Sequence, residues 1–358
     1  MLNELRAFLP MAEKVKARNP TMPILNHLCI ENGAMRITDL ETTVIIPVDD
    51  QRSFTLPISI MKQILKQRPA ALEITPLENY QMKVLFDNNS VVFPILDVEE
   101  YPSIPKGKFK KIGTWTKEIF LQLYKQLDFV SKDELKPALA GVWIDQNGRI
   151  NSCATDGHIL EYIENLQQDI KQCKTSGKFS GIIPANVIRL MAKYFRSNIA
   201  VYVSENYIRF ELPNKIEVYS RLIDEQYPEV NTFLKQDRSN EVKIKKAGLL
   251  KAIQAARPFS NPTTKLGILT VNNGTIAVNT RDIEQNIEFE THVPAVDRKG
   301  EELTVGFNMD YLEMVIKDID SAELLWYYEN AIRASIFRAS QDDCKKTCLL
   351  MPVRLEEE

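Results

Sequence analysis

The sequence predicts an α+β protein of three similar domains, each with two helices on antiparallel sheets. Two repeated units predict this architecture. The first is a hairpin, in which an apolar strand meets a turn at Asn-Gly or a near relative and a second strand follows. It occurs at 23–41, 137–158 and 264–283. Asn-Gly between alternating apolar runs is the strongest short-range signal for a hairpin.

The second unit is a short β-rich strand that meets Pro or Gly and continues into an amphipathic helix. It occurs at 54–69, 181–197 and 303–319. Two of the repeats also end on a common Tyr-Pro phrase, at 99–105 and 224–231. Divergent repeats of this length are whole domains rather than solenoid turns. The sequence therefore predicts domains at 1–108, 112–237 and 241–358, with charged joints at 106–113 and 235–241.

Helical periodicity predicts six helices, at 3–18, 58–68, 116–128, 185–196, 245–257 and 309–320. The helix at 185–196 shows how they are built, because an apolar stripe and a cationic face share it. The stripe comprises Val187, Leu190, Met191 and Tyr194, and the cationic face comprises Arg189, Lys193 and Arg196.

The charge of the six helices differs from that of the remaining chain. In chain order their net charges are +2, +3, 0, +3, +4 and −3, which is +9 in total, whereas the whole chain carries −3. One interpretation is that helices favour Lys and Arg and their outer faces are only solvated. The other is a positive face for phosphate. We expect sequence-independent, salt-sensitive contact with a phosphate backbone, because no base-reading motif is present.

Composition excludes several other classes of protein. No apolar run approaches the ~20 residues of a membrane span, and the first residues lack the features of a secretory signal. The five cysteines form an odd, scattered set, which is typical of reduced thiols in a cytoplasm. Cys344 and Cys348 can share a helical face, but further ligands are missing nearby in the sequence. We expect a cytoplasmic protein without metal or cofactor.

The segment Asp156-Gly157-His158 raises the question of catalysis, because an acid and a histidine stand two residues apart. A catalytic triad also needs a nucleophile within reach of the histidine. The sequence has no nucleophile elbow, metal-binding motif or phosphate loop. Ser152 and Cys153, the nearest candidates, are explained as strand residues. We therefore favour a turn without a catalytic role, and the catalytic interpretation stays as the alternative.

Six phrases carry a resemblance to a known family. "TMPIL", "ATDGH", "IIPANVIRLM", "SRLIDEQYPEV", "VGFNMDYL" and "LLMPVRL" occur in order and touch all three repeats. The chain resembles the bacterial sliding clamps, the β subunits of DNA polymerase III. The resemblance implies the DNA-clamp fold and a head-to-tail homodimer that closes a ring around double-stranded DNA. The implied partners are a replicative DNA polymerase, a clamp-loader ATPase and other proteins with a clamp-binding motif, and no membrane.

The resemblance also implies site residues. A hydrophobic pocket for a short client peptide would be formed by Leu139, Thr155, Gly157, His158, Leu160, Pro228, Phe233, Asn308, Tyr311, Met351, Pro352, Val353 and Arg354. With the charge pattern, it implies DNA-facing cations at Lys14, Lys16, Arg18, Lys62, Lys66, Arg68, Lys125, Arg189, Lys193, Arg196, Lys246 and Lys251. The implied dimer interface includes Val91, Phe93, Pro258 and Phe259, and no catalytic or metal-binding residue is implied.

Three features depart from the family pattern. The first helix begins almost at Met1, so we expect domain one to lack an edge strand. Ile159, Thr232 and Lys265 replace residue types common around the pocket, and three glutamates follow Leu355. Two alternative functions stay open: a clamp-like monomer that binds peptides without forming a ring, and a hydrolase of nucleic-acid metabolism that uses Asp156 and His158.

Overall fold

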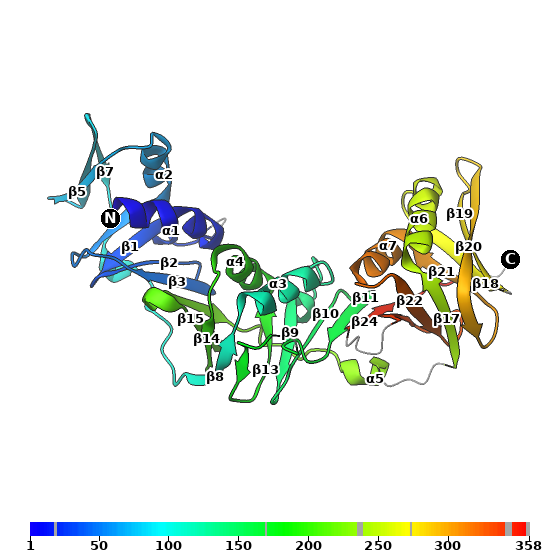
Figure 1. Ribbon diagram of the computed structural model, residues 1–358. Helices are drawn as coiled ribbons and strands as arrows, with labels where there is room; N and C mark the ends of the chain where they lie inside the picture. The colour runs from blue at the N-terminus through cyan, green and yellow to red at the C-terminus, as the bar shows by residue number, and fades with distance from the viewer. Residues whose placement is uncertain (18–19, 169, 235–238, 273, 341–345, 356–358) are drawn as a thin grey trace. The chain divides into compact units, whose positions relative to one another are not determined.

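A computed structural model describes residues 1–17, 20–168, 170–234, 239–272, 274–340 and 346–355 (Figure 1). Its contacts divide the chain into two compact units. Unit 1 comprises residues 1–125, 145–148 and 167–224, and unit 2 comprises residues 126–144, 149–166 and 225–358. The helices of the described chain are all too short or too polar to cross a membrane.

Unit 1 packs four helices with an antiparallel sheet. The helices are α1 (Leu2–Val15), α2 (Ile58–Lys66), α3 (Lys117–Gln126, in this unit up to Lys125) and α4 (Ala185–Tyr194). The sheet has the order β12-β8-β14-β15-β16-β3-β2-β1-β4. These strands are β12 (Lys174–Thr175), β8 (Lys110–Trp115), β14 (Ile199–Val203), β15 (Tyr207–Glu211), β16 (Glu217–Arg221), β3 (Thr42–Pro47), β2 (Ala34–Thr38), β1 (His27–Glu31) and β4 (Phe54–Pro57).

Unit 2 is organised in the same way. Its helices are α5 (Val230–Leu234), α6 (Lys246–Ala256) and α7 (Met309–Asp318). Its strands follow the order β10-β11-β24-β23-β22-β17-β20-β19-β18-β21. Their bounds are β10 (Ile150–Thr155), β11 (Ile159–Ile163), β24 (Lys346–Leu350), β23 (Ser335–Ala339), β22 (Glu323–Tyr328), β17 (Asn240–Lys245), β20 (Ile287–Lys299), β19 (Thr275–Asp282), β18 (Leu266–Asn272) and β21 (Leu303–Asn308). The neighbouring strand β9 (Gly141–Gln146) is divided between the two units.

Both repeated units of the sequence are confirmed. The predicted hairpins are β1–β2, β9–β10 and β18–β19, and Gly33, Gly148 and Gly274 have positive φ in their turns. The strand-to-helix units are β4–α2, β13 (Phe179–Pro184) followed by α4, and β21–α7. The six predicted helices correspond to α1, α2, α3, α4, α6 and α7. The predicted joint at 106–113 is wrong in part, since residues 110–113 belong to β8 and pair with β14.

The repeated Tyr-Pro phrase has a structural role in both places. Tyr101 is buried and its hydroxyl donates to the carbonyl of His27 at 3.1 Å. Tyr227 is buried, donates to the carbonyl of Cys153 at 3.1 Å, and stacks on Trp143. In each repeat a buried tyrosine therefore ties the closing segment back to the hairpin. A buried hydroxyl needs such a partner.

The sheet that completes the first repeat is smaller than its counterparts. It contains β5 (Leu72–Leu77), β6 (Gln81–Phe86) and β7 (Asn89–Pro94), in that order. In the other repeats a strand immediately before a helix, β8 or β17, pairs with the equivalent sheet. Among the described residues no strand pairs with the outer edge of β5, and α1 begins at Leu2.

Candidate functional site

The turn between β10 and β11 is fixed by its own side chains. The Thr155 hydroxyl donates to the carbonyl of Ile159 at 2.6 Å and accepts from the backbone N–H of Gly157 at 3.1 Å. The Asp156 carboxylate accepts from the backbone N–H groups of His158 and Ile159 at 2.8 and 2.9 Å. Gly157 has φ +97°, a conformation that favours glycine. The turn is therefore rigid before any ligand arrives.

This geometry contradicts the catalytic interpretation of Asp156 and His158. The carboxylate that would orient the histidine is used on the backbone of the turn. The His158 ring instead stacks on Tyr311, with centroids 5.8 Å apart and planes at 19°. Burial and the nearby Asp156 carboxylate together raise the pKa of Tyr311 to about 12. The hydrolase alternative is therefore wrong, and the histidine presents an aromatic surface.

The closing segment at residues 351–354 lies against this turn. Strand β24 pairs with β11, so that Ile159 is opposite Leu350, and the N–H of Met351 donates to the carbonyl of His158 at 2.8 Å. The N–H of Val353 then donates to the carbonyl of Gly306 on β21 at 2.8 Å. The segment thus connects the β10–β11 turn with β21. Two stretches about 190 positions apart are brought into contact by strand pairing.

Helix α7 contributes the third side of this arrangement. Asn308 is its N-cap, and its side-chain oxygen accepts from the N–H groups of Asp310 and Tyr311 at 2.9 and 3.3 Å. An Asn N-cap satisfies N–H groups that the helix leaves unpaired. The cap fixes the first turn of the helix and with it the position of Tyr311, whose ring contacts His158.

The remaining residues of the predicted pocket divide into buried and exposed ones. Thr155 and Leu160 are buried, whereas Gly157, His158, Pro228 and Arg354 are exposed. Leu139 ends the 3₁₀ helix η3 (Pro137–Leu139) and is half-buried, as are Pro352 and Val353. Met351 has 38% of its surface exposed. Phe233 lies in α5, and its side chain is outside the described part of the structure.

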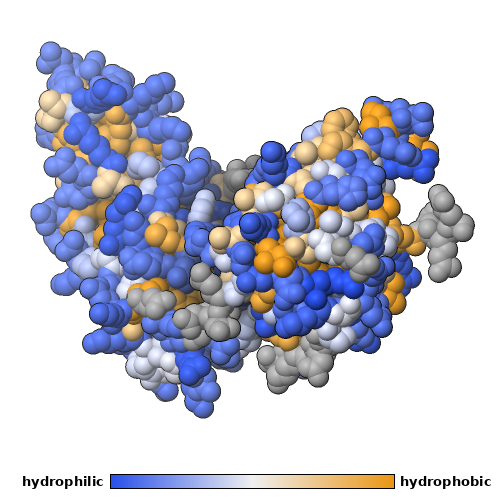
Figure 2. Space-filling view, turned by 45° about the vertical axis from the view of Figure 1, so that its right-hand side comes forward, coloured by the Kyte–Doolittle hydropathy of each residue, from blue (hydrophilic) through white to orange (hydrophobic). Residues whose placement is uncertain are grey.

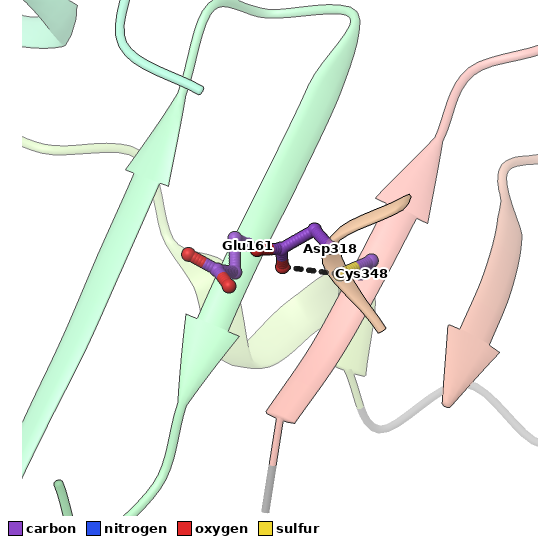
Figure 3. A group of neighbouring side chains, drawn as sticks. All are labelled: Glu161, Asp318 and Cys348. Atoms are coloured by element: carbon purple, nitrogen blue, oxygen red, sulfur yellow. Dashed lines mark hydrogen bonds between the residues drawn. The ribbon is translucent and has the colours of Figure 1, made fainter. Parts of the chain in front are cut away.

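A largely buried cluster of ionisable side chains involves β11 and β24, the two strands that flank the turn and the closing segment (Figure 3). Glu161 on β11, Asp318 at the end of α7 and Cys348 on β24 bring their ligand atoms within 4.8 Å of one another. The Lys346 ammonium lies 2.6 Å from Glu161 Oε1 and 2.7 Å from Asp318 Oδ2, so a cation of the protein already serves both carboxylates. Burial raises the pKa of Glu161 to about 8, and Lys346 opposes that rise. Cys344 lies outside the described residues.

Some of the predicted DNA-facing cations are already bound to other groups of the protein, and others are not. Lys62 is paired with Glu13 at 2.6 Å, and the Lys246 ammonium donates to the carbonyls of Lys317 and Ile319 at the end of α7. Arg18 lies outside the described residues. The others have no acidic partner within 4 Å in the described chain, and all but the half-buried Lys16 are exposed: Lys14, Lys16, Lys66, Arg68, Lys125, Arg189, Lys193, Arg196 and Lys251.

The acidic sixth predicted helix, α7, is explained by pairing within unit 2. Glu313 accepts from Gln254 at 3.0 Å, lies 2.6 Å from the Lys317 ammonium and is paired with Arg257. Arg257 also contacts Asp310 at 2.6 Å. The acids of α7 are therefore paired with Arg257, which follows α6, and with Lys317 of α7 itself. The charge pattern of the sequence does not reveal the contacts with Gln254 and Arg257, because they join residues more than 50 positions apart.

The predicted dimer residues lie on the 3₁₀ helix η5 (Arg257–Phe259) and on β7, and all but Phe93 have accessible side chains. Pro258 and Phe259 are exposed in η5, and the Phe259 ring stacks on Phe289 at 4.9 Å. Val91 and Phe93 lie on β7, which pairs with β6 alone in its sheet. Phe93 is only 4% exposed, so its side chain offers little surface to a partner. On the face shown in Figure 2, hydrophilic residues dominate and hydrophobic ones form separate patches.

Comparisons with known proteins agree with this geometry. Models of the central and C-terminal domains of the DNA polymerase III beta subunit match residues 116–229 and 232–354. The beta sliding clamp of Bacillus subtilis is 25% identical over 321 residues, which cover 87% of this chain and 82% of that protein. The beta sliding clamp of Staphylococcus aureus strain Mu50 is 23% identical over 367 residues, covering 96% and 95%.

A solved structure supports the fold over the whole chain. The crystal structure of the Bacillus subtilis DNA polymerase sliding clamp has a TM-score of 0.87 and 21% identity, and covers 99% of this chain and 98% of that one. The two domain models together match well over half of the residues, and the curated relatives extend the similarity to the first repeat. The chain therefore belongs to the family of bacterial beta sliding clamps, the beta subunits of DNA polymerase III.

Proposed function

We propose that this chain is a DNA sliding clamp, a non-catalytic processivity factor that encircles duplex DNA without sequence specificity. It tethers a replicative polymerase and other clients through a peptide pocket in unit 2. Family membership supports the general role. The residues that carry it, the homodimer, the clamp-loader ATPase as a partner and the cytoplasm as its location belong to the proposal.

One observation supports the pocket above all others. The β10–β11 turn, the closing segment and the first turn of α7 meet around the His158–Tyr311 ring pair. Met351 leaves more than a third of its surface exposed beside this pair. Apolar walls with a few fixed polar groups are typical of sites that hold small ligands and peptide side chains. We infer that a client peptide inserts its apolar side chains beside Met351 and His158.

Peptide binding to Met351 variants tests the pocket. A fluorescent Gln-Leu-x-Leu-Phe peptide is titrated against the full chain and against Met351→Ala, with fluorescence anisotropy as the readout. Loss of one buried apolar contact should cost about 1–3 kcal/mol of binding free energy. Ile332→Ala is the matched control, since Ile332 is exposed elsewhere in unit 2. Equal affinity for Met351→Ala and the unaltered chain would place the pocket elsewhere.

The free cations of the helices support DNA binding. Arg189 and Lys193 on α4 and Lys14 on α1 are exposed and have no acidic partner among the described residues. Contacts of this kind are sequence-blind and weaken strongly as salt increases. Retention on closed circular DNA after loading by a clamp-loader ATPase measures them. Arg189→Glu with Lys193→Glu should shorten retention and leave peptide binding unchanged, and unaltered retention would contradict the assignment.

Ring formation is tested by the mass in solution. Light scattering at micromolar concentration should give twice the mass of one chain, and Phe259→Glu should shift the equilibrium toward one chain. The exposed, stacked Phe259 and the free edge of β7 support this contact. A single-chain mass that Phe259→Glu does not change would favour the other candidate, a clamp-like monomer that binds peptides.

A further inference from the structure

A hollow of about 670 Å³ opens in unit 1 between α1, α3 and α4. Its lining includes Lys14 on α1, Leu121 and Tyr124 on α3, and Asn186, Arg189 and Lys193 on α4. The α4 residues are spaced at three and four positions, so they share one face of that helix. The Tyr194 hydroxyl donates to the carbonyl of Pro10 at 3.0 Å, which holds α4 against α1. The hollow is therefore a fixed feature of the packed helices.

The charge of the hollow favours an anion. Its lining contains cations from two helices and no acid. Glu13, the neighbour of Lys14, is occupied by Lys62 at 2.6 Å. The Lys193 ammonium lies over the Tyr194 ring at 5.1 Å, so Lys14 and Arg189 are the cations best placed for a ligand. Arginine is well suited to a phosphate group, because its planar fork can donate two hydrogen bonds.

The apolar part of the hollow favours an aromatic ligand. Leu121 and Tyr124 are one helical turn apart and are 39% and 50% exposed, whereas Ile119, Phe120 and Leu123 of the same helix are buried in the core. A half-exposed tyrosine offers a ring face for stacking. Bases of intact duplex are stacked on one another, so such a ring has no partner there. An unpaired base, in contrast, can stack on an aromatic side chain.

We propose that this hollow binds one unpaired nucleotide of single-stranded DNA. Lys14 and Arg189 hold its phosphate, Tyr124 stacks on its base, and the Asn186 amide lies within the same lining. The inference rests on the proposed function only in placing these helices against DNA. A clamp with this site distinguishes DNA that carries an unpaired strand from uniform duplex.

The test uses the full chain and two labelled probes of equal length, a thymidine oligomer and a blunt duplex. Fluorescence anisotropy at low salt gives both affinities. Tyr124→Ala should weaken binding of the oligomer by about 5- to 150-fold and leave the duplex within twofold, because stacking on one base is lost. Tyr124→Phe keeps the ring and should bind as the unaltered chain does. Tyr80→Ala, which removes a 63% exposed tyrosine elsewhere in unit 1, is the matched control.

Two further arms separate the possible outcomes. The double variant Lys14→Ala, Arg189→Ala should bind both probes more weakly, and its binding should depend less on salt. The proposal is overturned if Tyr124→Ala does not change the affinity for the oligomer, or if it lowers the affinities for oligomer and duplex equally. It is also overturned if the unaltered chain does not bind the oligomer. Retention on loaded circles and peptide binding are measured on the same variants, so a failure of the clamp function is seen separately.

Discussion

Replacing Lys346 with methionine should strongly destabilise unit 2. The Lys346 ammonium is 2.6 Å from Glu161, whose side chain is fully buried, and 2.7 Å from Asp318, which is 16% exposed. Methionine fills a similar volume but removes a counter-charge that both acids share. Removing one partner of a buried ion pair costs about 3–5 kcal/mol. We expect about 3 kcal/mol, because Lys346 is itself 21% exposed and Glu161 can take up a proton.

The pH dependence gives this prediction a second readout. The pKa of Glu161 is raised in the folded state to about 8 from 4.5. A raised carboxyl pKa means that its contribution to stability is fully present below pH 4.5 and is lost as pH rises through 8. Without Lys346 that pKa rises further, so the cost of Lys346→Met should stay nearly constant below pH 8, where Glu161 is protonated in both folded chains, and should grow as pH rises above 8.

Urea unfolding followed by circular dichroism at pH 5, 7 and 9 measures these values. Lys346→Met with Glu161→Gln should recover much of the lost free energy, because the uncompensated carboxylate is gone. Lys243→Met is the matched control, since Lys243 and Glu323 form a pair at 2.8 Å that is much more exposed to water and should contribute far less. A cost below that of the control, or no recovery in the double variant, would refute the reasoning.

Three other substitutions test separate features. Glu313→Gln should reduce the loss of stability that the protein shows in acid. Lys317, Gln254 and Arg257 hold the pKa of Glu313 at about 2, so the stability that Glu313 contributes is present above pH 4.5 and disappears as pH falls to 2. Thermal melts across that pH range measure the difference between the two chains. Tyr227→Phe should cost about 1–3 kcal/mol in urea unfolding, because the buried carbonyl of Cys153 loses its donor, and an unchanged midpoint would contradict the anchoring role. Gly157→Ala should lower the free energy of unfolding by about 1 kcal/mol or more and weaken binding of the client peptide, because φ +97° strains any other residue. Gly248→Ala in α6 is the control and should be tolerated.

The sequence by itself determined the local elements and their repetition. The hairpin turns at Gly33 and Gly148 follow from residues that are adjacent in the chain, and so does the helix of Val187, Leu190 and Met191. Their hydrogen bonds and periodicity are local, which is why a pattern of a few residues specifies them. The match of six phrases to one family then supplied the candidate pocket residues.

Only the tertiary structure decided which of these residues meet and which charges are free. Met351 reaches His158 because β24 pairs with β11, and Arg257 reaches Glu313 because α6 packs on α7. Likewise, Lys62 and Lys246 count as positive charges in the sequence, yet the fold directs both onto groups of the protein itself. Tyr124 is half-exposed in a cationic hollow that helices from distant parts of the sequence form. The physical reason is that pairing and burial depend on partners 50 to 190 residues away, and local sequence does not specify which segments the sheets bring together.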